Sequence, residues 1–357
     1  MKRQRGHKAR LYLTPSQLTA AEDQGHAARV MWNCLHSWWT MLPEGKRTPA
    51  AADEAIRQGR KDLDFLGALP AQAAQQVLKT YLRAWVNCWE GRARPPAFKA
   101  RFCSRMAIDI PQGRDLQIVP LNRRWGRMWA PKIGHVHFRW TKDLPVGKRA
   151  GKLDKVTGAR LVRESDGWHV VFRVQAEVVD PTPHTGPTVG IDRGIAKPLA
   201  PSDGTFREHS PWLTPGETKR LRRLEKASAR KRHARKKGER TSRRLARVCN
   251  QIAQLRAKAK RRAADWQHKT TTGIAETFSR AGVEGLAITG MVKSVKGTME
   301  APGRNVRQKA GLDRSIAGEA WGRTVTLLEY KMAEREGGEV KYVGIKSLYG
   351  TATRVGP

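Results

Sequence analysis

An excess of positive charge is the strongest constraint on how this chain folds. It has 69 lysines and arginines against 32 aspartates and glutamates, a formal net charge of +37. A compact chain with this charge repels itself, so we expect a polyanion to neutralise it, either nucleic acid or an anionic membrane. No apolar run approaches the roughly 20 residues that span a bilayer, and the first residues, MKRQRGHKAR, lack the apolar core of a signal peptide. We therefore expect a cytoplasmic nucleic-acid-binding protein without a membrane partner.

Cysteine usage argues against a zinc site. With 357 residues the chain is long enough for two or three domains, yet its cysteines are isolated and form no CxxC pair. Zinc ribbons and redox motifs need such pairs, so we expect neither. The cysteines are Cys34, Cys88, Cys103 and Cys249.

The first half changes character at Pro95-Pro96. A short alternating strand at 8–14 precedes a helical pattern that runs to about residue 90. Beyond the prolines come short alternating segments, and Asp166-Gly167 between two apolar-rich arms predicts a β-hairpin. We expect β-rich structure here, in the form of a small barrel.

An aromatic stripe lies in the helical part of this half. Val77, Tyr81, Trp85 and Trp89 recur at four-residue spacing. Such a stripe is typical of a helix-bundle core, and the alternative is a surface on which exposed bases stack.

The second half follows a proline-rich segment at 181–187, which we interpret as a linker. The apolar strand TVGIDRGIA comes next, and strand and helix patterns then alternate, which indicates an α/β layer fold. Within it, residues 211–262 hold 20 lysines and arginines against three acids. Helical spacing of the leucines predicts two long basic helices that break near Gly238, and a phosphate backbone is their expected partner.

Two carboxylates stand at the ends of predicted strands. Asp192 follows Thr188-Val189-Gly190-Ile191, and Glu284 lies in the strand pattern GVEGLAI about 90 residues later. Phosphodiester cleavage by two metals needs several carboxylates at one point, because Mg²⁺ prefers oxygen ligands. The alternative is that these acids only cap helices, which is common at strand ends.

The order of short motifs resembles one known family. RLYLTPSQ, RARPPAFKAR, DGWHVVFRV, VGIDRGI, ADWQHKTTTGIAETF, VEGLAITGM and GLDRSIAGEAWG follow one another in the order found in TnpB-like proteins and compact type V CRISPR effectors. The matches run from about residue 9 to residue 343. A series of this length is specific, although each motif is short.

This resemblance implies an α+β multidomain effector that binds a guide RNA and a double-stranded DNA target beside a short adjacent motif. Asp192 and Glu284 would be the first two RuvC carboxylates and share Mg²⁺. The implied parts are a wedge-like β-barrel from 1–15 and 96–180, a helical recognition insert at 16–95, a linker at 181–187, and a RuvC-like domain of ribonuclease H type at 188–357 with a basic helical insertion at 211–262.

The chain departs from the family pattern near residue 343. The family continues from this strand into a zinc ribbon and a third catalytic aspartate, whereas this sequence reads VGIKSLYGTATRVGP. Loss of single catalytic groups typically costs on the order of a thousandfold in rate. We expect an RNA-guided DNA-binding protein with impaired or lost cleavage, acting as a repressor or targeting module. The alternatives are an active Mg²⁺-dependent endonuclease and a non-guided RNA-binding protein.

Basic residues of these motifs are the expected nucleic-acid contacts, with an ordinary solvated helix face as the alternative for some. They are Lys99, Arg101, Arg222, Arg223, Arg230, Lys231, Arg232, Arg235, Lys236, His268, Lys269, Arg314 and Ser315.

Overall fold

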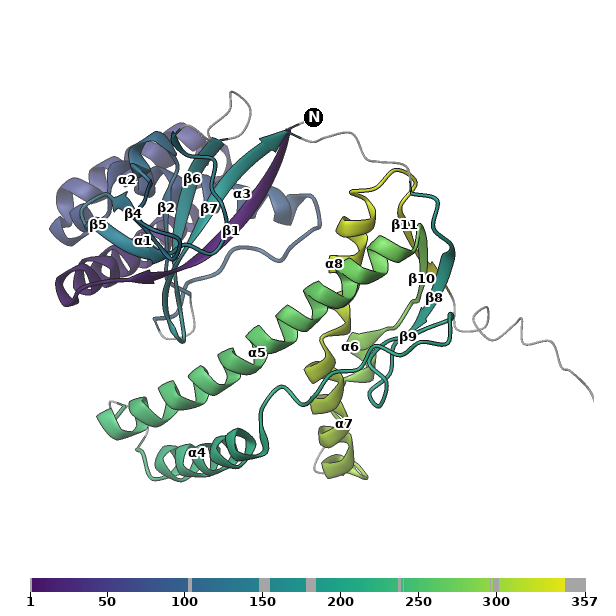
Figure 1. Ribbon diagram of the computed structural model, residues 1–357. Helices are drawn as coiled ribbons and strands as arrows, with labels where there is room; N and C mark the ends of the chain where they lie inside the picture. Colours follow the sequence, from purple (N-terminus) through teal and green to yellow (C-terminus); the bar gives the residue numbers. More distant parts are fainter. Residues whose placement is uncertain are drawn as a thin grey trace, which may run out of the picture. The chain divides into compact units, whose positions relative to one another are not determined.

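The computed structural model describes residues 2–101, 105–147, 155–177, 184–236, 239, 241–295, 297 and 302–343. The chain divides into two compact units, Met1–Val178 and Val179–Pro357, and each is described by itself (Figure 1). Part of the predicted linker, 181–183, and the segment after Val343 lie outside the described residues.

The first unit is built on a seven-stranded sheet of order β2-β6-β7-β1-β5-β4-β3. Neighbouring strands in this order run antiparallel. The strands are β1 (Lys2–Tyr12), β2 (Ala107–Ile110), β3 (Val119–Pro120), β4 (Trp125–Ala130), β5 (Gly134–Arg139), β6 (Lys155–Glu164) and β7 (Gly167–Glu177).

One strand joins the two halves of this sheet. β1 pairs with β7 from Lys2 to Arg10 and then with β5 at Leu11 and Tyr12. A strand that changes partners along its length is typical of small barrels and of orthogonally packed sheets. The sheet has β2 and β3 at its edges, so closure into the expected barrel stays a prediction.

The predicted Asp166-Gly167 hairpin is present between β6 and β7. Gly167 has a φ of 128°, a conformation that side chains other than glycine rarely adopt. Glu164 pairs with Gly167 across the turn, so the hairpin fixes the register of two of the longest strands in the unit.

The described residues between β1 and β2 form three α-helices and two short 3-10 helices. The α-helices are α1 (Pro15–Met41), α2 (Pro49–Asp62) and α3 (Ala71–Trp89). α1 begins at a capping box in which Thr14 and Gln17 each accept a hydrogen bond from the other's backbone amide, with Pro15 in the first turn.

The aromatic stripe of α3 divides between its two interpretations. Tyr81 is fully buried, and its ring meets the rings of Trp32 and Trp39 of α1 edge-on. Trp85 is half-buried, whereas Trp89 is 67% exposed. The helical period was therefore right, and the core interpretation holds for the middle of the helix but not for its end.

The second unit holds a four-stranded sheet of order β11-β10-β8-β9. β10 pairs in parallel with both β8 and β11, whereas the short β9 pairs antiparallel with β8. The strands are β8 (Thr188–Asp192), β9 (Ala200–Pro201), β10 (Arg280–Glu284) and β11 (Glu339–Val343).

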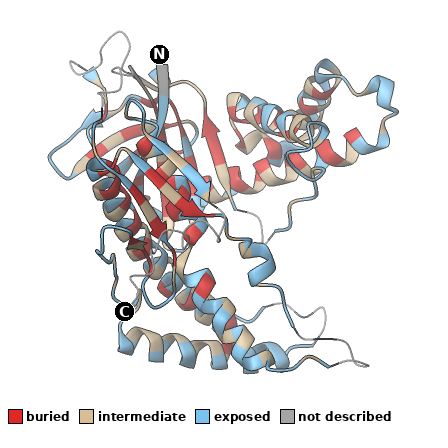
Figure 2. Cartoon of the chain, turned by 90° about the vertical axis from the view of Figure 1, so that its right-hand side faces the viewer, coloured by how far each residue is buried: buried red, intermediate tan, exposed pale blue. Residues whose placement is uncertain are grey.

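The helices described in the second unit are α4 (Pro215–His233), α5 (Arg243–Thr277), α6 (Ile288–Met291), α7 (Val306–Glu319) and α8 (Trp321–Met332). Of these, α5 and α8 supply the rest of the core. Ile274 of α5 and Leu328 of α8 pack with Val189 and Val283 of the strands. Figure 2 shows the buried parts of the strands and helices in red. The two predicted basic helices are α4 and α5, and none of the described helices is long and apolar enough to cross a membrane.

Replacing Met332 is expected to destabilise the second unit. Its side chain is fully buried in this small core, so Met332→Ala loses its burial and leaves a cavity. Such changes cost about 2–5 kcal/mol of unfolding free energy. Urea denaturation followed by circular dichroism measures this, with Met291→Ala as the control because Met291 is 39% exposed. Equal effects of the two changes would contradict the assigned core.

Candidate metal and nucleic-acid site

Asp192 and Glu284 meet at one edge of the second sheet. β8 and β10 are parallel neighbours, and Ile191 pairs with Val283. Asp192 directly follows Ile191, Glu284 directly follows Val283, and each acid is the last residue of its strand. The two acids therefore lie side by side at the carboxyl ends of the paired strands. The carboxyl ends of parallel strands are where α/β sheets place their ligands.

The two carboxylates interact electrostatically. Glu284 is 7% exposed, whereas Asp192 is open to solvent. Burial and, second, the charge of Asp192 raise the pKa of Glu284 above its ordinary value, while Arg193 opposes this. A divalent cation would relieve the repulsion and would find the oxygen ligands that Mg²⁺ prefers, so the pair fits that ion.

Sequence reasoning missed Arg193, which is part of the same site. Its side chain is 6% exposed, and Nη2 donates a hydrogen bond to the main-chain carbonyl of Glu284. Burial lowers the pKa of Arg193, whereas Glu284, Tyr342 and Asp192 raise it, in that order. The only feature of the sequence that could have indicated Arg193 is its position directly after Asp192. That feature is weak, because an arginine after a strand is more often exposed to solvent.

The basic residues of α4 are presented to solvent. Arg222, Arg223 and Arg230 are exposed and line a surface groove that runs along the helix. The groove also contains Lys219 and Lys226, and Leu213 adds an apolar wall. Lys231 and Arg232 in the last turn, and Arg235 and Lys236 beyond it, are exposed as well.

The acids of α4 face α5 instead. Glu217 accepts hydrogen bonds from Lys258 and, at 2.7 Å, from Arg262. The bond from Lys258, then the Thr214 amide and then Arg262, lower the pKa of Glu217 to about 2. Glu225 likewise pairs with Arg256 at 2.7 Å. Both acids are therefore neutralised inside the helical hairpin, and its outer surface keeps the positive charge.

An aromatic cluster holds the segment that leads into α4. The ring of His209 stacks on Trp212 with centroids 3.6 Å apart and meets Trp266 of α5 edge-on. His209 Nε2 lies 2.8 Å from a carboxylate oxygen of Glu319 at the end of α7. Contacts with two other helices thus fix the direction in which α4 starts.

In the first unit, Lys99 lies in a segment without helix or strand whose backbone is held by α1. Asn33 exchanges two hydrogen bonds with the backbone of Lys99, at 2.8 and 3.1 Å. The ammonium group lies 3.5 Å from the centre of the Trp32 ring, a cation–π contact. Burial and, second, the charge of Arg160 lower the pKa of Lys99 to about 8. Arg101 is exposed two residues later.

The remaining predicted contact residues are exposed on two helices. Lys269 pairs with Asp265 at 2.7 Å on α5, next to His268. On α7, Arg314 donates to the carbonyl of Ala310, and Ser315 donates to that of Gly311. Because the two pairs belong to different helices, their joint action on one nucleic acid stays a prediction.

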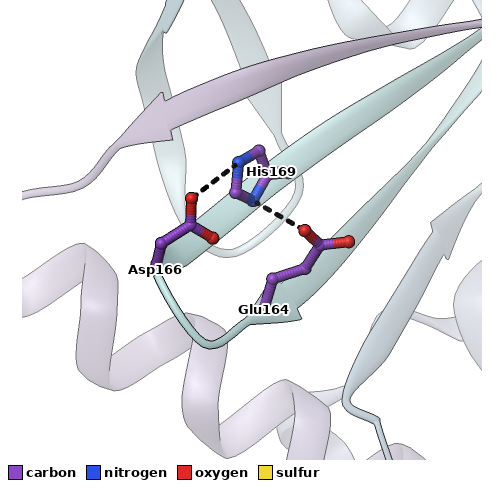
Figure 3. A group of neighbouring side chains, drawn as sticks. All are labelled: Glu164, Asp166 and His169. Atoms are coloured by element: carbon purple, nitrogen blue, oxygen red, sulfur yellow. Dashed lines mark ion pairs between the residues drawn. The ribbon is translucent and has the colours of Figure 1, made fainter. Parts of the chain in front are cut away.

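A separate group of possible metal ligands lies at the β6–β7 hairpin. Figure 3 shows His169 between Glu164 and Asp166, with ring nitrogens 4.0 and 3.9 Å from the respective carboxylate oxygens. Their donor atoms all lie within 4.8 Å of one another. The ammonium group of Lys8, however, lies 2.6 Å from Glu164 and already neutralises it. We interpret the group as a charge network that anchors the hairpin.

This network gives a pH prediction. Burial and then the charge of Lys8 lower the pKa of His169 below 6.5, although both acids oppose them. The unfolded chain therefore takes up a proton first, so this contribution to stability is full above pH 6.5 and is lost as the pH falls below it. The slope is at most about 1.4 kcal/mol per pH unit for one proton. Denaturation of His169→Gln between pH 5 and 8 should show a smaller slope, with His137→Gln, an exposed histidine of β5, as the control. An unchanged slope would contradict the assignment.

Comparisons with known proteins relate the chain to one family. The profile of the OrfB_IS605 family, described as "Probable transposase", matches residues 169–295, which include both Asp192 and Glu284. The "Putative RNA-guided DNA endonuclease InsQ" of Escherichia coli strain K12 is 33% identical over 280 residues, 78% of this chain and 64% of that protein. By these similarities the chain is TnpB-like, and it spans 64% of the length of the relative from Escherichia coli.

Two further similarities extend over more of this TnpB-like chain. A "Putative RNA-guided DNA endonuclease" of Streptomyces pristinaespiralis is 24% identical over 335 residues, 92% of this chain and 75% of that protein. A chain in the cryo-EM structure of the Cas12f1-sgRNA-target DNA complex has a TM-score of 0.52 at 13% identity, covering 96% of this chain and 75% of its own. This second similarity supports the mixed α/β fold alone.

Proposed function

We propose that this TnpB-like chain is an RNA-guided DNA-binding protein of the cytoplasm. It holds a structured guide RNA, pairs that RNA with one strand of a DNA duplex beside a short adjacent motif, and cleaves the DNA weakly or not at all. The observation that carries the proposal is the α4–α5 hairpin, in which the acids of α4 pair with α5 while the cations of α4 line an outer groove. Such a surface suits a phosphate backbone read by shape.

Weak cleavage is argued from the carboxylate site. We place a RuvC-like centre at the edge of the parallel strands β8 and β10, with Asp192 and Glu284 as the groups that would hold Mg²⁺. The ion would stabilise charge on a phosphodiester during cleavage. The two acids share their surroundings with a buried arginine, which reduces the attraction for a cation. Target binding without cutting suits a repressor or targeting role.

The experiment that tests guiding begins with the RNA that copurifies with the full chain. Sequencing should show one discrete, structured species. Replacing its guide segment should then move DNA binding, in a mobility-shift assay, to duplexes that match the new segment. A heterogeneous RNA pool together with DNA binding that ignores the guide would contradict the proposal and indicate a non-guided RNA-binding protein.

A second candidate function is that of an active Mg²⁺-dependent DNA endonuclease. It is favoured by the pKa of Glu284, which burial and Asp192 raise, because repelling carboxylates at one point are typical of a working metal site. Under this alternative, Asp192→Asn abolishes cutting and spares guide-dependent binding.

A further inference from the structure

A cavity lies in the first unit where α1, α3 and β2 pack against one another. The segment that carries Lys99 and one residue of β6 also line it, and its volume is about 120 Å³. An apolar cavity of roughly 150 Å³ holds benzene, so this cavity has room for a group the size of a phosphate. The carboxylate site and the α4 groove belong to the second unit, so the proposed function leaves this cavity without a role.

Four of the side chains that line the cavity are positively charged. They are Arg29, Lys99, Arg105 and Arg160. The carboxylate of Asp109 also lines it, but that group pairs with Arg160 and with Arg173, each at 2.8 Å. Within the part of the chain that the structure describes, no carboxylate pairs with the other three cations, and the Nε of Arg29 is buried without a hydrogen-bond partner. The cavity therefore collects positive charge that the fold does not compensate.

The position of Lys99 is fixed by contacts with α1. Asn33 holds its backbone with two hydrogen bonds, and its ammonium group lies over the ring of Trp32, whose Nε1 donates to the carbonyl of Ala97. Burial and, second, the charge of Arg160 lower the pKa of this lysine to about 8. A bound anion would oppose both effects, because a nearby opposite charge favours the charged form of an amine.

We propose that this cavity is a phosphate pocket, in which Arg29, Lys99 and Arg105 hold one phosphate group of the RNA that the protein binds. Phosphate suits the site because its oxygens accept from several cations at once, and the planar fork of arginine matches it. The group is a terminal phosphate or an internal phosphodiester, which share this chemistry and are separated by the second test below. The inference rests on the proposed function only in taking RNA as the source of the phosphate.

The charge of the lining should set the affinity for phosphate. A carboxylate placed in the cavity repels the anion, and at a partly buried site one such charge exceeds the energy of a tenfold change in affinity. Gln76 of α3 lines the cavity, and Gln76→Glu adds a negative charge with almost no change of shape. The preceding residue, Gln75, is exposed on the same helix outside the cavity. Gln75→Glu is therefore a control that is matched in charge, shape and position in the sequence.

The first test titrates inorganic phosphate by calorimetry into the full chain, freed of RNA by nuclease and high salt, in a phosphate-free buffer. Gln76→Glu is expected to weaken phosphate binding about tenfold or more, whereas Gln75→Glu should stay within about threefold of the unaltered protein. Arg29→Gln and Lys99→Gln should also weaken it about tenfold, with the exposed Arg94→Gln as their control.

Two results of this test overturn the inference. One is an unaltered protein that binds no phosphate, and the other is equal phosphate affinity of Gln76→Glu and Gln75→Glu. Circular dichroism establishes that each variant is folded. If Gln76→Glu does not fold, the comparison of Arg29→Gln with Arg94→Gln decides in the same way, and equal affinities of these two overturn the inference.

The second test identifies the source of the phosphate with the RNA that copurifies. If the group is terminal, phosphatase treatment of the RNA should weaken its binding to Gln75→Glu but not to Gln76→Glu. If it is internal, replacing single phosphates by uncharged methylphosphonates should find one position that behaves in this way. The absence of any such phosphate, or displacement of inorganic phosphate by a glutamate-rich peptide but not by the RNA, overturns the inference. Because the first test uses no RNA, a failure of guide-dependent DNA binding rejects the proposed function while the phosphate titration still decides the pocket.

Discussion

Mixed with its guide RNA, Mg²⁺ and a matching duplex, the protein is expected to bind the DNA and leave nearly all of it intact. We expect cutting at least about a thousandfold slower than by the relative from Escherichia coli, the size of effect that disabling a single catalytic group typically has. The reason is local. The described residues place two carboxylates at the carboxyl ends of β8 and β10, and the guanidinium of Arg193 donates a hydrogen bond to the main-chain carbonyl of Glu284.

Labelled duplexes sampled over hours, with both proteins loaded to equal occupancy in a mobility-shift assay, measure this difference. Equal occupancy matters because it separates weak cutting from weak binding. Asp192→Asn is the internal control, and it should leave both the occupancy and the slow background unchanged. Rapid double-strand cutting that Asp192→Asn abolishes would reject the prediction and establish the endonuclease alternative.

The second large effect concerns the groove of α4. Replacing Arg222, Arg223, Lys226 and Arg230 by glutamine should weaken RNA binding by about two to three orders of magnitude at moderate salt. Every cation that no longer neutralises a phosphate should also reduce the slope of log affinity against log salt by about 0.9. These four cations line the groove, and the nearby acids Glu217 and Glu225 are paired with α5.

A matched variant controls for net charge. It removes four exposed cations that already lie beside acids, so its total charge equals that of the groove variant. Its changes, all to glutamine, are at Arg57, Arg92, Arg114 and Lys341. Fluorescence anisotropy with the copurified RNA at several salt concentrations measures both variants. If their salt slopes agree, the groove is not where the phosphates bind.

Much of the second unit was predictable because local signals agree with the final structure. The pattern of an apolar strand that ends in an acid predicted the positions of Asp192 and Glu284 at strand ends. The parallel register of β8 and β10 then brings the two residues together. The α4–α5 hairpin was predictable for the same reason, since leucines at helical spacing and an N-cap such as Thr214 specify helices locally.

What the sequence could not predict depends on packing between distant segments. The guanidinium of Arg193 is buried where it donates a hydrogen bond to the main-chain carbonyl of Glu284, 91 residues away along the chain. Lys99, which we expect at phosphates, has its ammonium group over Trp32, and Asn33 of the same helix α1 holds its backbone. Tyr81 and Trp89 share one helical stripe, and only the position of α1 makes the first buried and the second exposed.

The length of α5 connects two places that are far apart in the second unit. It is one helix of 35 residues, roughly 50 Å long, with α4 packed on its first half and the parallel strands on its last turns. Shortly after it ends at Thr277, the chain enters β10, which carries Glu284. A straight helix transmits a tilt along its whole length. A nucleic acid that tilts the α4 end of α5 would therefore also displace the other end of α5, and with it the strand that carries Glu284.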